Sequence, residues 1–281
     1  MALTVNTNLS AMQAYQNLSR TSASMANSMA KLSSGLRINT AADDAAGLTV
    51  SEGLRSQVNG YGVAARNAQD GINMVQTADG ALGEVHSILQ RMRDLAVQGA
   101  NDTNNTASRT AITKEAGDLS RELYRITNGT NFNSIDLLKG GSKSFQVGAG
   151  GTTNDVISVA LADVGTSTGT LMSADGTAAG AGFDVTTNAA SQTTIAAIDT
   201  AITAVSGNRA DLGAAQNRLN HAMNIANVSA QNLAASQSHI TDTDMAQEMV
   251  NYTKANILSQ AGTAMLAQAN QSGQGILKLL G

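Results

Sequence analysis

The longest regular pattern of apolar residues runs from Leu54 to Gly99. Apolar or small residues recur there at alternating steps of three and four, the spacing of one helix face packed along another helix. The positions are Leu54, Val58, Tyr61, Ala65, Ala68, Ile72, Val75, Ala78, Leu82, Val85, Leu89, Met92, Ala96 and Gly99. At 1.5 Å per residue this helix would be about 70 Å long. A helix of that length needs packing partners along most of its length, so the pattern predicts a helical bundle.

Two further helices are predicted as its partners. Apolar residues from about residue 193 onward recur at steps of seven, which is the heptad spacing of bundled helices. They are Ile198, Val205, Leu212, Leu219, Ala226 and Leu233. Arg209 and Gln216 occupy the second seam position, which indicates a wide and partly polar bundle. The polar turn 102–105 joins the long helix to another helix over about 107–128, giving a helical hairpin.

Both ends of the chain read as amphipathic helices with very few charges. The helices are expected over 6–34 and about 243–279, with Gly35 ending the first, Thr40 or Asp43 capping the next, and 241–244 offering a cap for the last. Their apolar stripes include Leu9, Met12, Leu18, Met25, Met29 and Leu32, then Met249, Ile257, Met265 and Leu266, followed by Ile276, Leu277 and Leu280. A solvated helix usually carries charges on its outer face. We therefore expect residues 1–40 and 240–281 to be disordered in the monomer and to fold against other copies.

The middle of the chain has a different character. After an irregular apolar anchor at 132–138, the stretches SFQVGAG and DVISVAL alternate as two short strands around a glycine-rich turn. They predict a β-hairpin. The following stretch to about residue 190 is rich in Gly, Ser, Thr and Ala, and is expected to be an exposed segment.

These patterns predict a mainly α fold. Long antiparallel helices from both termini pack as coiled-coil-like bundles, with a small β-hairpin and irregular segment in the centre. Three domains are expected: an inner terminal domain of 1–44 and 239–281, a helical bundle of 45–140 and 191–238, and a hairpin with a short variable exposed segment at 141–190.

Composition narrows the function classes. Only 2% of the 281 residues are aromatic, and proline and cysteine are absent. Disulfides and thiolate metal sites are therefore excluded. The net charge of −4, without a basic run, argues against nucleic-acid binding. No apolar run is long enough to span a membrane. The amino terminus has neither the positive region nor the continuous apolar region of a secretory signal peptide.

No group of residues predicts catalysis. The three histidines, His86, His221 and His239, are far apart and lack ligand spacing. A G-x-S-x-G nucleophile elbow, a P-loop and a dinucleotide-binding fingerprint are all missing. The pair Asp43 and Asp44 lacks a third metal ligand nearby. We therefore expect neither enzymatic activity, nor a cofactor, nor a metal.

Several long motifs closely resemble bacterial flagellin. They are NTNLSAMQAYQNL, KLSSGLRINTAADDAAGLTVSE, ARNAQDGINMVQTADGAL and LQRMRDLAVQGAN near the amino terminus, then DLGAAQNRLNHA and QAGTAMLAQANQSGQGILKLLG near the carboxy terminus. The resemblance covers about 1–140 and 190–281. It implies a secreted, extracellular subunit that polymerises into the flagellar filament for swimming motility. It also implies unfolded export through the flagellar secretion apparatus, a cytoplasmic chaperone for the last helix, and contacts with the filament cap and hook-associated proteins.

The resemblance also points to one group of surface residues. Some flagellins are bound by Toll-like receptor 5, and the matching positions here are Gln90, Arg91, Leu95 and Glu115. Asp94 stands where Glu is usual, and Gly99 where Ser is common. The competing interpretation is that these residues serve packing between subunits.

Three other classes were considered. A hook–filament junction protein of the same superfamily would be similar at both ends, though less so through QAGTAMLAQANQ. A chemoreceptor-like signalling rod would need charged outer faces, which the terminal helices lack. An enzyme has no supporting residues.

Overall fold

The structure is a computed structural model that describes residues 8–174, 180 and 182–280, with side chains as far as 271. The chain forms two compact units. Residues 58–230 make up the first, called here the bundle. Residues 1–57 together with 231–281 make up the second, called here the terminal unit.

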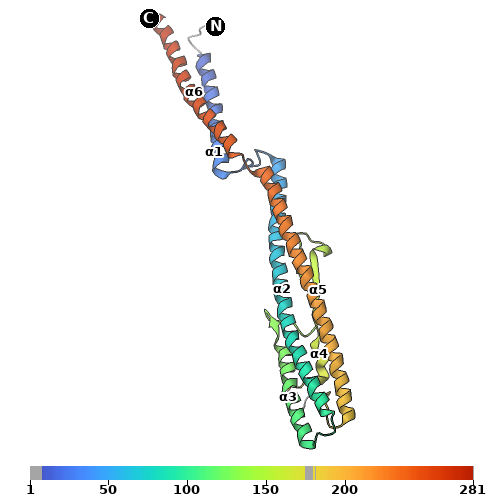
Figure 1. Cartoon of the computed structure of the whole chain (residues 1–281). Helices are drawn as coiled ribbons and strands as arrows, with labels where there is room; N and C mark the ends of the chain where they lie inside the picture. Colours follow the sequence, from blue (N-terminus) through green and yellow to red (C-terminus); the bar gives the residue numbers. More distant parts are fainter. Residues whose placement is uncertain (1–7, 175–179, 181, 281) are drawn as a thin grey trace. The chain divides into compact units, whose positions relative to one another are not determined.

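Six α-helices account for most of the described chain (Figure 1). They are α1 (Leu9–Ser34), α2 (Ala45–Gly99), α3 (Thr106–Gly129), α4 (Val164–Thr168), α5 (Asn188–Thr241) and α6 (Met245–Leu280). The short elements are β1 (Asn131–Phe132), β2 (Ile135–Asp136), β3 (Ser142–Gln146), β4 (Val156–Ala160) and the 3₁₀ turns η1 (Thr153–Asp155) and η2 (Gly169–Leu171). The prediction of a mainly helical fold with a small central β-hairpin is confirmed.

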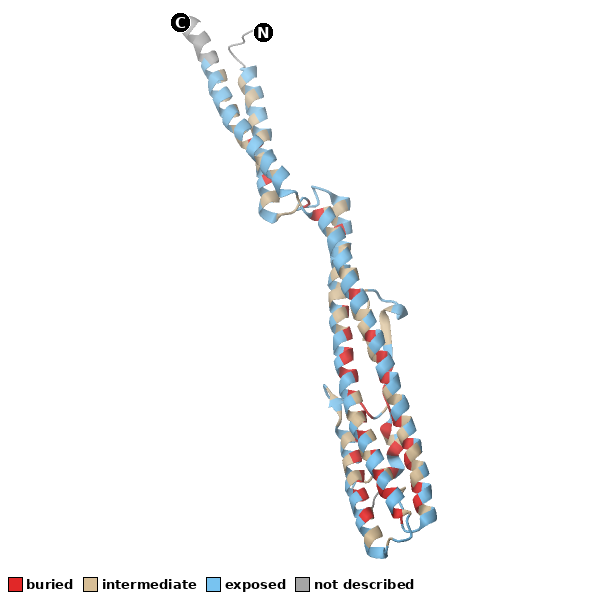
Figure 2. Cartoon of the chain, in the orientation of Figure 1, coloured by how far each residue is buried: buried red, intermediate tan, exposed pale blue. Residues whose placement is uncertain are grey.

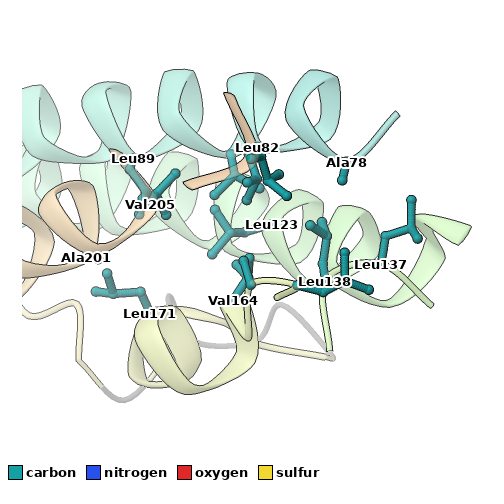
Figure 3. Close-up of a cluster of buried hydrophobic side chains, with 14 of the residues drawn as sticks. Ala78, Leu82, Leu89, Leu123, Leu137, Leu138, Val164, Leu171, Ala201 and Val205 are labelled. Carbon is teal, nitrogen blue, oxygen red and sulfur yellow. The ribbon is translucent and has the colours of Figure 1, made fainter. Parts of the chain in front are cut away.

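The core of the bundle lies where the predicted stripe of α2 meets α3, α4 and α5. Every stripe position from Ala68 to Ala96 is at most 4% exposed. The heptad positions of α5 from Ile198 to Ala226 are at most 1% exposed. Figure 3 shows Leu82 and Leu89 near Leu123, Val164 and Val205 in one apolar cluster. The periodicity therefore identified the core-facing side of both long helices.

The first part of the α2 stripe is less buried than the pattern predicts. Leu54, Val58, Tyr61 and Ala65 are only half-buried, whereas full burial begins further along the helix. In this stretch α2 packs partly against the β3–β4 hairpin: the backbone of Gly60 lies against Ala149, and Gly71 lies against Phe145. A narrow hairpin covers less of a helix than α3 covers farther along.

The predicted β-hairpin is formed by β3 and β4. The strands pair antiparallel from Ser142 opposite Ala160 to Gln146 opposite Val156. Beyond the paired residues, the carboxylate of Asp155 accepts hydrogen bonds from the backbone N–H and the hydroxyl of Thr152, at 3.1 and 2.7 Å. Asn67 of α2 donates to the carbonyl of Gln146, which ties the hairpin to the bundle.

The segment after the hairpin corrects an expectation. It was expected to be exposed, yet Leu171, Phe183 and Val185 are at most 5% exposed and belong to the core. The hydroxyl of Ser120 on α3 donates to the carbonyl of Leu171 at 2.7 Å. Gly99 permits the close approach of Val185, because a Cβ at that position would lie 2.6 Å from the Cβ of Val185. A few isolated apolar residues of this segment cover the core, although the surrounding residues are polar. Residues 175–179 and 181 of the segment lie outside the described chain.

In the terminal unit, α1 and α6 pack against each other as an antiparallel pair. The amide of Asn8 donates to the carbonyl of Ala269 at 2.9 Å near one end. Near the other end, Leu36 and Asp242 form an isolated antiparallel bridge. Between them, Leu18 packs against the backbone of Gly262. This pair is called here the terminal hairpin.

The helix ends of the terminal unit follow ordinary capping rules, and the predicted cap of α2 is corrected. Gly35 ends α1 with a left-handed φ of 72°, which costs glycine little. Asp44, and neither Thr40 nor Asp43, caps α2 by accepting from the N–H of Gly47 at 2.9 Å. Asp43 instead accepts from the backbone N–H and hydroxyl of Thr40, and these bonds lower the pKa of its carboxyl. Asp244 caps α6, as the sequence predicted.

Candidate functional site

The terminal hairpin exposes many apolar side chains. Ten of the large apolar side chains that the structure describes in α1 and α6 are between 47% and 67% exposed. They are Leu9, Met12, Tyr15, Met29, Met245, Met249, Val250, Ile257, Leu258 and Met265. Figure 2 shows the two helices mostly in the colour of exposed residues. A pair of helices packed only against each other can cover one face of each, so the remaining faces stay open.

The residues singled out in these helices from sequence fall into two groups. Six of them are exposed: Leu9, Met12, Met29, Met249, Ile257 and Met265. Four are half-buried: Leu18, Met25, Leu32 and Leu266. The predicted residues Ile276, Leu277 and Leu280 lie beyond the described side chains. The six exposed residues are therefore free to contact another molecule.

An apolar groove lies on the outer face of α6. It is lined by Met249, Val250, Thr253, Lys254, Ile257 and Leu258, with a volume of about 480 Å³. Lys254 is the single charged residue of this lining. Such a groove suits an apolar partner, because little charge has to leave water when the groove is covered.

A polar groove runs between the two terminal helices. Arg20, Ser28 and Lys31 of α1 and Glu248 and Asn251 of α6 are among its lining residues. The hydroxyl of Ser28 donates to Glu248, and this bond is the main reason that the pKa of the Glu248 carboxyl is lowered. These polar contacts set how α1 and α6 face each other.

The residues considered for receptor contact are only partly brought together. Arg91 of α2 donates through Nε to Oε1 of Glu115 on α3 at 2.8 Å, so these two residues form one exposed ion pair. Gln90 is exposed beside them and its amide lies 2.9 Å from Nε2 of His86. Leu95 is 1% exposed and belongs to the core of the bundle. The surface at this place is therefore carried by Gln90, Arg91 and Glu115.

Two ion pairs between α2 and α5 were not predicted. Arg93 donates to Asp199 at 2.6 Å, and this hydrogen bond lowers the pKa of the Asp199 carboxyl. Arg209 donates to Asp79 at 2.8 Å, which explains an arginine at a seam position of α5. Part of the signal is in the sequence: α2 carries an acid and then a base fourteen residues later, and antiparallel α5 carries an acid and then a base ten residues apart. Reading it required knowing the register of the two helices.

Among the described residues, no group of three acidic, histidine or cysteine side chains could hold a metal ion. None of the described helices has both the length and the apolar content needed to cross a membrane.

Comparison with known proteins identifies the family. The model for the bacterial flagellin N-terminal helical region matches residues 5–143, and the model for the C-terminal helical region matches residues 195–280. A flagellin of Halalkalibacterium halodurans is 46% identical, over 98% of this chain and 99% of that protein. A flagellin of Bacillus subtilis is 44% identical over the same shares. The crystal structure of Bacillus cereus flagellin aligns with a TM-score of 0.50 at 34% identity, covering 61% of this chain and 94% of that one.

These matches extend through both terminal regions, which sets aside the junction-protein, signalling-rod and enzyme alternatives. The chain belongs to the bacterial flagellin family, and it is a structural, non-enzymatic protein that polymerises into the extracellular flagellar filament for motility.

Proposed function

We propose that the exposed faces of the terminal hairpin are the surfaces through which subunits pack in the filament. The main observation behind this proposal is the set of ten exposed apolar side chains on α1 and α6. Burying one such side chain contributes about 1.5–3 kcal/mol. Four of these side chains, Met249, Val250, Ile257 and Leu258, line one apolar groove, and an exposed apolar patch of this kind marks a contact surface.

The low charge of these helices supports the same proposal. Over Leu9–Ser34 and 245–271 the charged residues are Arg20, Lys31, Glu248 and Lys254. Covering both helices completely therefore leaves few ionised groups to be desolvated. In this proposal residues 1–44 and 239–281 form the inner domain of the filament, 45–140 with 191–238 form the helical bundle around it, and 141–190 hold the β-hairpin and the short variable segment.

We further propose that residues 1–40 and 240–281 gain stable order only when other copies cover them. Ordering the backbone costs about 1–2 kcal/mol per residue. The described side chains of α1 and α6 include a single fully buried apolar residue, Ala255, to offset that cost. Contacts with neighbouring copies supply the missing burial.

The steps that precede assembly, export and chaperone binding, are proposed from membership of the flagellin family alone. A chain whose ends fold late suits unfolded export through the flagellar secretion apparatus. A cytoplasmic chaperone would cover the apolar face of the last helix until export. The filament cap and the hook-associated proteins would contact the subunit during and after its incorporation.

Binding by Toll-like receptor 5 is proposed for the surface of Gln90, Arg91 and Glu115. It is supported by their exposure and by the Arg91–Glu115 ion pair. Arg91→Ala should reduce receptor signalling while filaments still form. Loss of assembly with unchanged signalling would assign these residues to packing between subunits.

The main proposal is tested by making the groove of α6 polar. The double variant Ile257→Gln, Leu258→Gln should remain a folded monomer with an unchanged urea midpoint for the bundle, and should fail to form filaments. Ala107→Gln, at an exposed position of α3 in the bundle, is the matched control and should polymerise normally. Electron microscopy and sedimentation of seeded polymerisations give the readout. Filaments of the double variant at the normal critical concentration would contradict the proposal.

A further inference from the structure

The bundle carries a second groove that its own core does not fill. The groove lies between α2 and α3 and has a volume of about 550 Å³. Its lining includes Gly80, Ala81, Glu84, Ile88, Ile126 and Gly129. No atom lies within 4 Å of where a Cβ would stand on Gly80 or Gly129, so the backbone is open to an approaching side chain there.

The groove has apolar walls and an acidic rim. Ile88 and Ile126 are half-buried and pack against the core from below. Glu122 and Arg125 form an ion pair with each other at 2.5 Å, and so neutralise each other. Glu84 is exposed and enters none of the ion pairs formed among the described residues. The groove therefore presents one uncompensated negative charge beside an apolar floor.

A complementary ridge lies on α5 of the same bundle. Arg218, His221, Ile225 and Val228 follow one another at steps of three and four, which places them on one helix face. Ile225 is 65% and Val228 58% exposed, the largest exposed fractions among the large apolar side chains of the bundle described by the structure. Arg218 is exposed and is the single charged residue between 212 and 230. It too enters none of the described ion pairs.

We propose that the ridge of one subunit, formed by Arg218, Ile225 and Val228, docks into the α2–α3 groove of a second copy. Ile225 and Val228 fill the space above Gly80 and Gly129, and Arg218 pairs with Glu84. The sizes agree: the α2 side of the groove, from Gly80 to Ile88, is about 12 Å long, and the ridge, from Arg218 to Val228, is about 15 Å long.

The geometry of the two surfaces determines the kind of assembly. Ridge and groove are different surfaces on different helices, so a contact between them is heterologous. Each added copy leaves one free ridge and one free groove, and such a contact that does not close continues as a helical filament. The proposal rests on the polymerisation proposed above and adds a contact made by the bundle to the contacts made by the terminal hairpin.

Charge exchange tests the pairing directly. Glu84→Arg and Arg218→Glu should each raise the critical concentration for polymerisation about tenfold, equivalent to ~1.4 kcal/mol per contact. The double variant restores an opposite pair and should return the critical concentration to within about threefold of the wild type. Two single variants that polymerise normally, or a double variant no better than the singles, would overturn the proposal.

Filling the groove is an independent test. Gly80→Leu places a side chain in open space on a helix, so the monomer should become more resistant to urea while polymerisation is lost. Gly213→Leu is the matched control, because Gly213 is an exposed helical glycine with equally open space outside the groove. It should stabilise the monomer and still polymerise.

The outcomes separate this inference from the proposed function. Wild-type protein that forms no filaments would remove the proposed function. Filaments formed by Gly80→Leu as readily as by the wild type would remove the groove contact alone. Circular dichroism of each variant before polymerisation establishes that the bundle is folded.

Discussion

The bundle and the terminal hairpin are built from the same kind of helix, yet they differ in what their apolar faces contact. In the bundle the stripe of α2 is covered by α3, α4 and α5, and Leu82, Leu89 and Leu123 are fully buried. In the hairpin α1 and α6 cover one face of each other, and Ile257 and Met265 are more than 60% exposed. The bundle completes its core within one chain, whereas the hairpin leaves apolar faces uncovered that, in our proposal, other chains cover.

The difference shows that an apolar periodicity predicts a contact without saying which molecule supplies it. The charge content of the outer face carries that information. The bundle has seven Asp or Glu residues on α2 and α3 between 70 and 122 that keep its surface soluble, while the terminal hairpin has one, Glu248, over Leu9–Ser34 and 245–271. In our proposal, the bundle determines the stability of the monomer, while the hairpin and surface contacts of the bundle determine polymerisation.

The largest expected effect comes from core truncation. Leu123→Ala in the bundle should lower the free energy of unfolding of the monomer by about 2–5 kcal/mol, because a cavity remains. Ile257→Ala in the hairpin should leave the free energy of unfolding of the monomer unchanged within about 0.5 kcal/mol. It should instead raise the critical concentration for polymerisation. Urea denaturation and polymerisation assays measure the two quantities. Equal destabilisation of the monomer by both variants would erase the distinction between the regions.

Removing a helix cap should have a smaller effect, which again differs between the bundle and the terminal hairpin. Asn105 caps α3 by accepting from the N–H of Ser108 at 2.8 Å, and Asn8 caps α1 through Ala11 at 3.0 Å. Asn105→Ala should cost the monomer about 1 kcal/mol. If α1 gains stable order only in the filament, as proposed, Asn8→Ala should leave the stability of the monomer unchanged and should instead lower the melting temperature of the filament. A monomer destabilised by Asn8→Ala would show that the hairpin is already folded.

Replacing an exposed helical glycine should raise the stability of the monomer rather than lower it. Gly207 on α5 has open space around its missing Cβ. Gly207→Ala should therefore stabilise the bundle by about 0.5–1 kcal/mol through helix propensity. Thermal unfolding of the monomer provides the measurement, and an unchanged or lower melting temperature would show that this part of α5 is not a continuous helix.

The smallest effect is pH-dependent. Arg93 lowers the pKa of the Asp199 carboxyl in the folded bundle. The Arg93–Asp199 pair therefore stabilises the bundle fully above the unfolded pKa of Asp199, about 3.9, and this stabilisation is lost as the pH falls from there through the lower folded pKa. Asp199→Asn should flatten the decline of monomer stability between about pH 5 and 3. The pKa of Glu248 is lowered as well, by Ser28, but within the hairpin. Glu248→Gln should accordingly alter the acid dissociation of filaments and leave the acid unfolding of the monomer unchanged.

Sequence reasoning succeeded where one physical signal repeats over many residues. The seven-residue spacing from Ile198 to Ala226 and the alternation in the two strands each recur often enough to identify a buried face. It failed where a single residue decides the outcome. Val185 is buried because Gly99 lies opposite it, and Asp44 rather than Asp43 caps α2 because of the loop path before the helix. Such facts depend on tertiary placement, and the polar composition around Val185 pointed the other way.

Hydrogen exchange of backbone amides, compared between dilute monomer and assembled filament, tests the central claim most directly. The account predicts that amides of residues 9–34 and 245–271 exchange rapidly in the monomer and become protected in the filament, while amides in the core of the bundle are protected in both. Strong protection of the terminal amides in dilute monomer, equal to that of the bundle, would contradict it.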